Sequence, residues 1–163
     1  ADPRDRGNWT SGRVGIGVNK GTKYGVSAAA YPNLDIRNLT LDDAKRIYRR
    51  DYWDKLRCDD LPPGVAYMLF DMAVNDGTPL RTQILQRGLG VADDGRIGDV
   101  TVSAARSMPQ DEVLERTAAQ RAKKYRDLAA RSPNYAAFLG SEKPRRGWLG
   151  RNLTVLDQAL SMV

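Results

Sequence analysis

Residues 62–77 read PPGVAYMLFDMAVNDG, and this stretch decides the fold that the sequence predicts. Two prolines open it, which suits the first turn of a helix, where backbone N–H groups have no intrahelical partner. Apolar residues then recur three and four positions apart, the spacing of a buried helix face. They are Val65, Met68, Leu69, Met72 and Ala73. We therefore predict a helix that ends at Gly77 and forms the buried centre of the domain.

A second helical pattern precedes this one. Residues 40–43, Thr-Leu-Asp-Asp, match a capping box, in which side chains at the first helical turn bind exposed backbone N–H groups. Core-type residues follow on one face, at Ala44, Ile47, Tyr48 and Tyr52. The pattern predicts a helix from Thr40 to about Leu56.

The rest of the chain also has mainly helical periodicity. We expect helices over residues 79–87 and 100–106, joined by a turn-rich stretch at 90–98. Two longer amphipathic patterns follow Pro109. Their apolar positions are Leu114, Ala118, Ala122, Tyr125 and Ala129, then Leu149, Leu153, Leu156, Leu160 and Val163. At this spacing they are interpreted as core contacts rather than as a cofactor site.

Residues 1–38 have a different composition, rich in glycine and short polar residues. Such a composition favours loops and turns, because glycine adopts backbone angles that other residues avoid. The weak alternation of residues 13–18 predicts a short, partly exposed ribbon. The fold class is therefore mostly α, with a glycine-rich loop or short β-ribbon region at the N-terminus. We expect one domain over 1–163, with a loop-rich lobe at 1–38 and a helical lobe at 39–163.

The formal net charge of +6 suggests an anionic partner, either nucleic acid, an anionic lipid surface or an anionic cell-wall polymer. Charge alone does not choose among them, and solvated helix faces explain it equally well, because the basic residues are scattered. No nucleic-acid-binding motif is present, so we expect no nucleic-acid partner. No apolar run is long enough to span a bilayer, so we expect no membrane insertion.

Cysteine and histidine usage narrows the chemistry. Cys58 is the one cysteine, so an internal disulfide is impossible. Histidine is absent, which excludes serine-histidine and cysteine-histidine catalysis and nearly every zinc site. We therefore expect no metal and no cofactor, and any hydrolysis must use carboxylates.

Acids and hydroxyls near the N-terminus are the informative polar residues. Asp2 and Asp5 flank a turn, and Thr22 follows Gly21 in a second glycine-containing stretch. Taken alone, they are ordinary loop residues, because Asp and Thr commonly bind loop backbone groups.

Read together, several segments resemble the phage-type N-acetylmuramidase family, also called the secretion-activator family. Residues 2–5, Asp-Pro-Arg-Asp, match the family's Asp-Pro-x-Asp turn, and residues 22–27, Thr-Lys-Tyr-Gly-Val-Ser, match its threonine-containing stretch. The likeness continues through 47–53 and 69–77 and ends at 147–151, so it spans nearly the whole chain.

A second resemblance lies within the first. Residues 85–91, followed by 94–98 and Thr101, are similar to the peptidoglycan-binding segment that is paired with this family. We assign that likeness to residues 80–106. The sequence departs from the family in one loop, because the tryptophan-containing insert at residues 7–21 is longer than in the commonest members.

The resemblance implies a lysozyme-like helical domain and a glycoside hydrolase of the endolysin type. Its bond would be the β-1,4 linkage between N-acetylmuramic acid and N-acetylglucosamine. The family's general acid is the glutamate of a Glu-Gly-Gly motif, which the spacing places a few residues before Ala1. Without it, the chain as given is expected to be slow or inactive, because lost acid catalysis costs about a hundred- to ten-thousand-fold.

The resemblance also implies roles for individual residues. Asp5 and Thr22 would hold or activate the attacking water. Tyr24 would stack on a sugar face, and Asn75 would hydrogen-bond an N-acetyl group, with Asp71 sharing the same polar wall. Asn75 has an equal alternative as a helix cap. For two further residues, Trp148 and Arg151, a core anchor and a salt-bridge partner are the favoured interpretations.

Bacterial peptidoglycan is therefore the expected partner of a monomeric protein. We expect synthesis in the bacterial cytoplasm and action in the periplasm or at the cell wall, since no signal peptide follows Ala1. The alternative function is a non-catalytic peptidoglycan-binding module.

Overall fold

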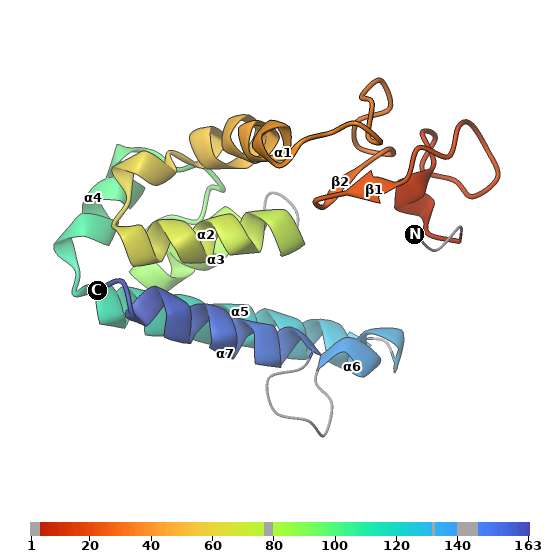
Figure 1. Ribbon diagram of the computed structural model, residues 1–163. Helices are drawn as coiled ribbons and strands as arrows, with labels where there is room; N and C mark the ends of the chain where they lie inside the picture. The colour runs from red at the N-terminus through yellow and green to blue at the C-terminus, as the bar shows by residue number, and fades with distance from the viewer. Residues whose placement is uncertain (1–3, 77–79, 132, 140–146) are drawn as a thin grey trace. The chain divides into compact units, whose positions relative to one another are not determined.

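The computed structural model describes residues 4–76, 80–131, 133–139 and 147–163. The chain forms two compact units, which we call the N-terminal unit (Ala1–Asp51) and the helical unit (Tyr52–Val163). In the described residues the fold is mostly helical, with a small antiparallel sheet near the N-terminus (Figure 1), so the predicted fold class is confirmed. The predicted division at residues 38 and 39 stays a prediction.

The sheet of the N-terminal unit is a tight hairpin. It follows the 3-10 helix η1 (Arg6–Asn8) and pairs β1 (Thr22–Lys23) with β2 (Val26–Ser27). Thr22 lies opposite Ser27. The two turn residues, Tyr24 and Gly25, have positive φ angles of 51° and 78°, the requirement of a type I′ turn.

The ribbon predicted over residues 13–18 is not formed. This segment consists of turns, and an isolated bridge between Trp9 and Asn19 closes its base. Gly15 and Gly17 both have a φ of 79°, a left-handed conformation that breaks an extended strand. The alternation in sequence therefore reflects glycines at turns, and it leaves exposed side chains at Val14, Ile16 and Val18.

Helix α1 (Leu41–Tyr48) begins at the predicted capping box. The Thr40 Oγ1 accepts a hydrogen bond from the Asp43 N–H at 3.1 Å, and the Asp43 Oδ2 accepts one from the Thr40 N–H at 3.0 Å. One face of α1 packs into a small core. The buried members are Val26, Ala28, Ile36, Leu39, Ala44 and Ile47.

The helical conformation predicted to about Leu56 changes type beyond α1. A π-helical turn, η2 (Arg49–Trp53), is followed by the 3-10 helix η3 (Asp54–Leu56). Arg57 then adopts a left-handed conformation with a φ of 51°, and a further 3-10 helix, η4 (Cys58–Asp60), precedes α2. The prediction was right about the helical character and wrong about one continuous α-helix.

The helical unit is built around α2 (Pro63–Asp76), which packs against α3 (Leu80–Leu89), α5 (Gln110–Arg131) and α7 (Gly147–Leu160), as Figure 1 shows. All five predicted core positions of α2 are at most 1% exposed, so its central role is confirmed. The expected stop at Gly77 and the expected helix start at Pro79 lie outside the described residues.

Two further helices complete this unit. The helix predicted over 100–106 is α4 (Asp99–Ser107), and α6 (Pro133–Leu139) had no counterpart among the predicted helices. On α5 the predicted positions Leu114, Ala118 and Tyr125 are buried. None of the described helices combines the length and the apolar character that crossing a membrane requires.

The buried face of α7 follows the predicted leucine stripe only in part, because Leu156 and Leu160 pack against the core and Leu153 does not. Leu153 is 52% exposed and Val163 is 64% exposed, whereas Val155 and Ala159 are buried. The reason is a close helix contact: a Cβ atom on Gly64 of α2 would lie only 2.7 Å from the Ala159 carbonyl oxygen. Small residues permit this approach, and the large leucines lie to the side of it.

Candidate functional site

In the N-terminal unit, Asp5 caps the short helix η1. Its Oδ1 accepts a hydrogen bond from the Gly7 N–H at 2.8 Å, which fixes the carboxylate next to the first turn. The Asp5 side chain is exposed. Its neighbour in the motif, Asp2, lies outside the described residues.

Gly7 brings Asp5 and Thr22 together. A Cβ atom at Gly7 would lie 3.2 Å from the Asp5 Oδ1, 3.7 Å from the Thr22 Oγ1 and 3.5 Å from the Ser27 Cβ. Side chains from the N-cap of η1, from β1 and from β2 therefore surround one glycine. The two predicted catalytic residues converge there, although 17 positions of sequence separate them.

The hairpin explains why Thr22 occupies this place. Thr22 and Ser27 are opposite each other in the antiparallel register, so their side chains lie on the same face of the sheet. The Thr22 side chain is exposed and makes no hydrogen bond to any described residue. Its hydroxyl is therefore available to a water molecule or a ligand. Gly7 and Ser27 had no predicted role, and the motif spacing contains no signal of their proximity.

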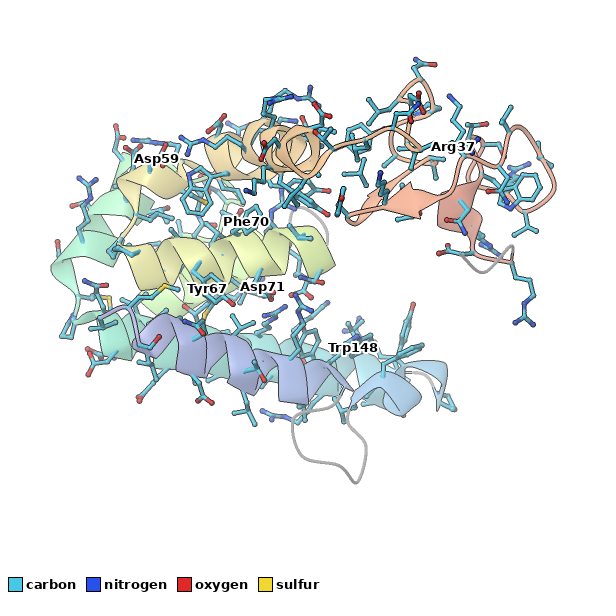
Figure 2. All side chains as sticks on the ribbon, viewed as in Figure 1. Arg37, Asp59, Tyr67, Phe70, Asp71 and Trp148 are labelled. Atoms are coloured by element: carbon cyan, nitrogen blue, oxygen red, sulfur yellow. The ribbon has the colours of Figure 1, made fainter. Side chains whose placement is uncertain are left out.

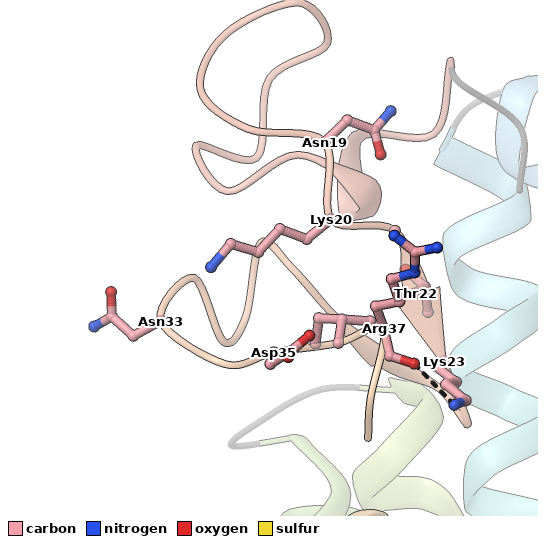
Figure 3. Close-up of a pocket in the computed structure, with 9 residues that line it drawn as sticks. Asn19, Lys20, Thr22, Lys23, Asn33, Asp35 and Arg37 are labelled. Carbon is pink, nitrogen blue, oxygen red and sulfur yellow. Dashed lines mark hydrogen bonds between the residues drawn. The ribbon is translucent and has the colours of Figure 1, made fainter. Parts of the chain in front are cut away.

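A hollow of about 550 Å³ adjoins Thr22 in the same unit (Figure 3). It is lined by Asn19, Lys20, Gly21, Thr22, Lys23, Asn33, Asp35, Ile36 and Arg37. Two of its lysines bind loop carbonyls: Lys20 Nζ donates to the Pro32 oxygen at 2.7 Å, and Lys23 Nζ donates to the Arg37 oxygen at 3.0 Å. The Asn38 amide lowers the pKa of Asp35. Three cations and one ionised acid give this hollow a positive balance.

Tyr24 lies at the tip of the hairpin and is 49% exposed. Its carbonyl oxygen accepts a hydrogen bond from the Tyr48 hydroxyl at 3.1 Å, and the Lys23 Nζ lies 5.5 Å from its ring centroid. The ring is thus supported on one side and has an accessible surface.

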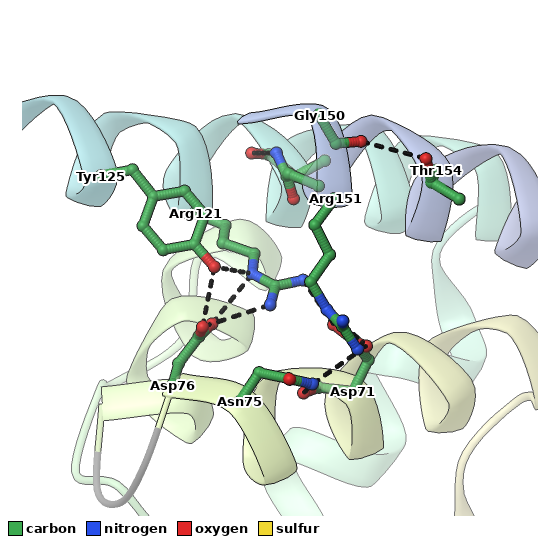
Figure 4. Close-up of polar contacts among 10 residues, drawn as sticks. Asp71, Asn75, Asp76, Arg121, Tyr125, Gly150, Arg151 and Thr154 are labelled. Atoms are coloured by element: carbon green, nitrogen blue, oxygen red, sulfur yellow. Dashed lines mark hydrogen bonds and ion pairs between the residues drawn. The ribbon is translucent and has the colours of Figure 1, made fainter. Parts of the chain in front are cut away.

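In the helical unit, Asp71 is 8% exposed and lies on the side of α2 that faces α7 (Figure 2). Two arginines bind its carboxylate (Figure 4). Its Oδ2 accepts a hydrogen bond from Arg121 Nη1 at 2.9 Å, and its Oδ1 accepts one from Arg151 Nε at 3.1 Å. Arg151 is therefore a salt-bridge partner, as the sequence suggested. Because a different arginine binds each oxygen, the Asp71 carboxylate is held in one orientation.

The second acid of this cluster is Asp76. Its Oδ2 accepts from Arg121 Nε at 2.9 Å, and its Oδ1 accepts from the Tyr125 hydroxyl at 2.7 Å. Burial alone would lower the pKa of Arg121, but the Asp76 charge raises it above its usual value. Burial raises the pKa of Tyr125 above its ordinary 10.0. The cluster therefore keeps a charged guanidinium and a neutral phenol inside the protein.

Asn75 extends this cluster to the surface. Its Nδ2 donates to the Asp71 carbonyl oxygen at 2.8 Å and to the Asp71 Oδ1 at 3.2 Å. These two bonds fit the alternative role of Asn75 as a helix cap. They use only its Nδ2, so the Oδ1 of this exposed residue remains available to a ligand. Asp71 and Asn75, both predicted to contact substrate, are thus brought together by one helix turn.

The peptidoglycan-type segment is held together by a buried amide. The Gln86 Nε2 donates to the Asp94 Oδ1 at 2.7 Å and to the Arg96 carbonyl oxygen at 3.0 Å, and its Oε1 accepts from the Gly95 N–H at 3.0 Å. The Gln86 bond lowers the pKa of Asp94. The two halves of the motif are therefore structurally linked.

Comparisons with known proteins agree with this organisation. The family described as Glycosyl hydrolase 108 matches residues 1–77, and the family described as Predicted Peptidoglycan domain matches residues 81–153. A solved structure, that of SagA from Brucella abortus, is similar with a TM-score of 0.68 and 28% identity. The match covers 86% of this chain and 80% of that one. No curated protein matched the chain.

The two family matches follow one another with few residues between them, in the order in which the sequence resemblances occur. They relate the chain to glycoside hydrolases and to peptidoglycan, and therefore to the cell wall. Together with the similar solved structure, they show that residues 1–77 of this chain form a segment of the phage-type N-acetylmuramidase family, glycosyl hydrolase 108, and that a peptidoglycan domain follows it at residues 81–153.

Proposed function

We propose that this protein is an endolysin-like N-acetylmuramidase, which cleaves the β-1,4 bond between N-acetylmuramic acid and N-acetylglucosamine. The observation that carries the proposal is the convergence of Asp5 and Thr22 at Gly7, in a chain of a glycosyl hydrolase family. Such cleavage takes place in phage lysis or in remodelling of the bacterial wall.

Breaking a glycosidic bond needs a proton donor at the leaving oxygen and a base or nucleophile on the other side. We assign the donor to the glutamate of the Glu-Gly-Gly motif that we expect before Asp2. Asp5 then acts as the base: the Gly7 N–H binds its Oδ1, so its Oδ2 accepts the proton of the attacking water. The Thr22 hydroxyl binds the same water and orients it.

In this proposal each unit is assigned its own substrate contacts. Tyr24 presents an accessible aromatic face to a sugar ring, and the Asn75 Oδ1 accepts a hydrogen bond from the N–H of an N-acetyl group. Asp71 acts behind Asn75, because its carbonyl and carboxylate oxygens hold the amide in place. The positive hollow beside Thr22 attracts the carboxylates of wall peptides.

The test is peptidoglycan digestion by the chain extended at its N-terminus with the natural upstream coding sequence. Turbidity loss and release of reducing ends are measured for the parent, Asp5→Asn and Thr22→Val. We expect each substitution to reduce the rate by roughly a hundredfold or more, because each removes part of the water activation. Asp42→Asn, an exposed acid of α1, is the matched control and keeps full activity.

The match of residues 81–153 favours one alternative, a non-catalytic peptidoglycan-binding module. That module would sediment with purified cell walls and release no reducing ends from them, with or without the upstream residues. We further propose a monomer that is made in the bacterial cytoplasm and acts in the periplasm or at the wall. Digestion by the extended chain would exclude the non-catalytic alternative.

A further inference from the structure

The helical unit contains a hollow of about 190 Å³ with an aromatic wall. We call it the aromatic hollow. It is lined by Asn75, Asp76, Leu80, Ile84, Lys124, Tyr125, Leu128, Tyr135 and Trp148. We propose that it binds one N-acetylated sugar that carries a carboxylate, a muramic-acid-type unit. This inference rests on the proposed function, because peptidoglycan supplies such a unit wherever its stem peptide has been removed.

Aromatic rings form one side of the aromatic hollow. The Trp148 ring is stacked with Tyr125 at a centroid distance of 5.2 Å and is tilted against Tyr135 at 6.1 Å. Tyr135 is 46% exposed, so part of its ring faces solvent. Rigid amphipathic rings of this kind offer a flat apolar surface and lose little conformational freedom on binding. They suit the apolar face of a pyranose ring.

The charge in the aromatic hollow favours an anion. Lys124 has no hydrogen bond or ion pair with a described residue, whereas the adjacent Lys123 is paired with Asp127 at 3.0 Å. Asp76 also lines the hollow, but Arg121 and Tyr125 already bind its carboxylate. The acid is thus neutralised while the lysine is available. A carboxylate on the ligand would form a charge-assisted hydrogen bond with the Lys124 ammonium.

The third recognition element is the amide of Asn75. Its Nδ2 is engaged by Asp71, so the Oδ1 remains as an oriented acceptor for the N–H of an acetamido group. A volume of about 190 Å³ is below the roughly 300–1,000 Å³ of pockets that enclose whole ligands. The aromatic hollow therefore fits one ring with its substituents, and not a length of glycan chain.

The test uses N-acetylmuramic acid, whose lactyl carboxylate is free, with the full chain. This probe has no β-1,4 linkage, so binding is measured independently of hydrolysis. Isothermal titration calorimetry gives its Kd for the parent, Lys124→Met and Tyr135→Ala. We expect each substitution to weaken binding by about tenfold, because each removes one of the contacts that orient the ligand.

Two matched controls are available in the same helices. Lys123→Met removes a neighbouring positive charge that does not line the hollow, and Phe138→Ala removes a ring that stacks on Trp148 at 5.6 Å without lining it. We expect both to bind the probe within about twofold of the parent. Equal thermal unfolding temperatures for all four variants establish that the fold is intact.

The outcomes separate this inference from the proposed function. An absence of saturable binding, or equal losses in Lys123→Met and Lys124→Met, overturns the aromatic hollow as a binding site. Binding that depends on Lys124 and Tyr135 supports it even if the extended chain digests no peptidoglycan. N-acetylglucosamine, which has no carboxylate, is expected to bind parent and Lys124→Met alike, and a loss in Lys124→Met would contradict the assigned ion pair.

Discussion

Replacing Arg121 with methionine is expected to destabilise the protein strongly. The Arg121 side chain is fully buried and binds Asp71, 8% exposed, and Asp76, 11% exposed. Methionine fills a similar volume but leaves Asp76 without its arginine partner and Asp71 with Arg151 alone. Removing one partner of a buried ion pair typically costs about 3–5 kcal/mol, because an uncompensated charge remains inside. The melting temperature is then expected to fall by roughly 6–20 °C.

The measurement is urea unfolding followed by circular dichroism, together with a thermal melt. Arg116→Met is the matched control: it lies on the same helix, and its pair with Glu112 is about half exposed, at 54% and 42%. Such exposed pairs contribute about 0–1 kcal/mol. A double variant, Arg121→Met with Asp76→Asn, is expected to recover part of the loss, because it removes the carboxylate that has lost its arginine partner. A loss no larger for Arg121→Met than for Arg116→Met would refute this reasoning.

Three further predictions concern packing and pH. Gly64→Ala should cost about 1–3 kcal/mol, since its Cβ meets the neighbouring backbone of α7, whereas Gly98→Ala, with no atom within 4 Å, should change stability by less than about 0.5 kcal/mol in urea melts. Val155→Ala should lower the free energy of unfolding by about 2 kcal/mol, and Leu153→Ala should lower it by less than about 0.5 kcal/mol. A larger loss for Leu153→Ala than for Val155→Ala would show that Leu153 lies on the buried face of α7. Above pH 10 the unfolded state loses the proton of Tyr125 while the folded state, with its raised pKa, retains it, so stability falls as the pH rises. Tyr125→Phe should weaken that fall, and identical alkaline slopes in the two proteins would contradict the assignment.

The sequence predicted the features that depend on local patterns. The capping box at Thr40 and the core face of α2 were both right, because they need only residues within a few positions of each other. The rotation of α7 could not be predicted, since Leu153 and Val155 are equally apolar and a contact with Gly64 decides between them. Periodicity identifies a helix, but tertiary packing selects its buried face.

The candidate site likewise contains residues that the sequence identified and residues that only the fold reveals. Asp5 and Thr22 were identified from motifs of a known family, and their proximity to Gly7 required the hairpin. Arg121 could not be identified, because its two carboxylates lie 50 and 45 positions earlier in the chain. A single arginine on an amphipathic helix is usually solvated, and only the fold reveals that this one is buried.

The position of the junction between the two units affects limited proteolysis and the choice of recombinant fragments. It falls between Asp51 and Tyr52, within the π-helical turn η2, where backbone N–H and carbonyl groups are engaged in helical hydrogen bonds. Proteases prefer extended, exposed loops, so limited digestion should spare this junction and attack the glycine-rich turns at residues 11–18 first. A recombinant fragment that started at Tyr52 would expose a broken helical turn at its first residue, and so longer fragments are preferable.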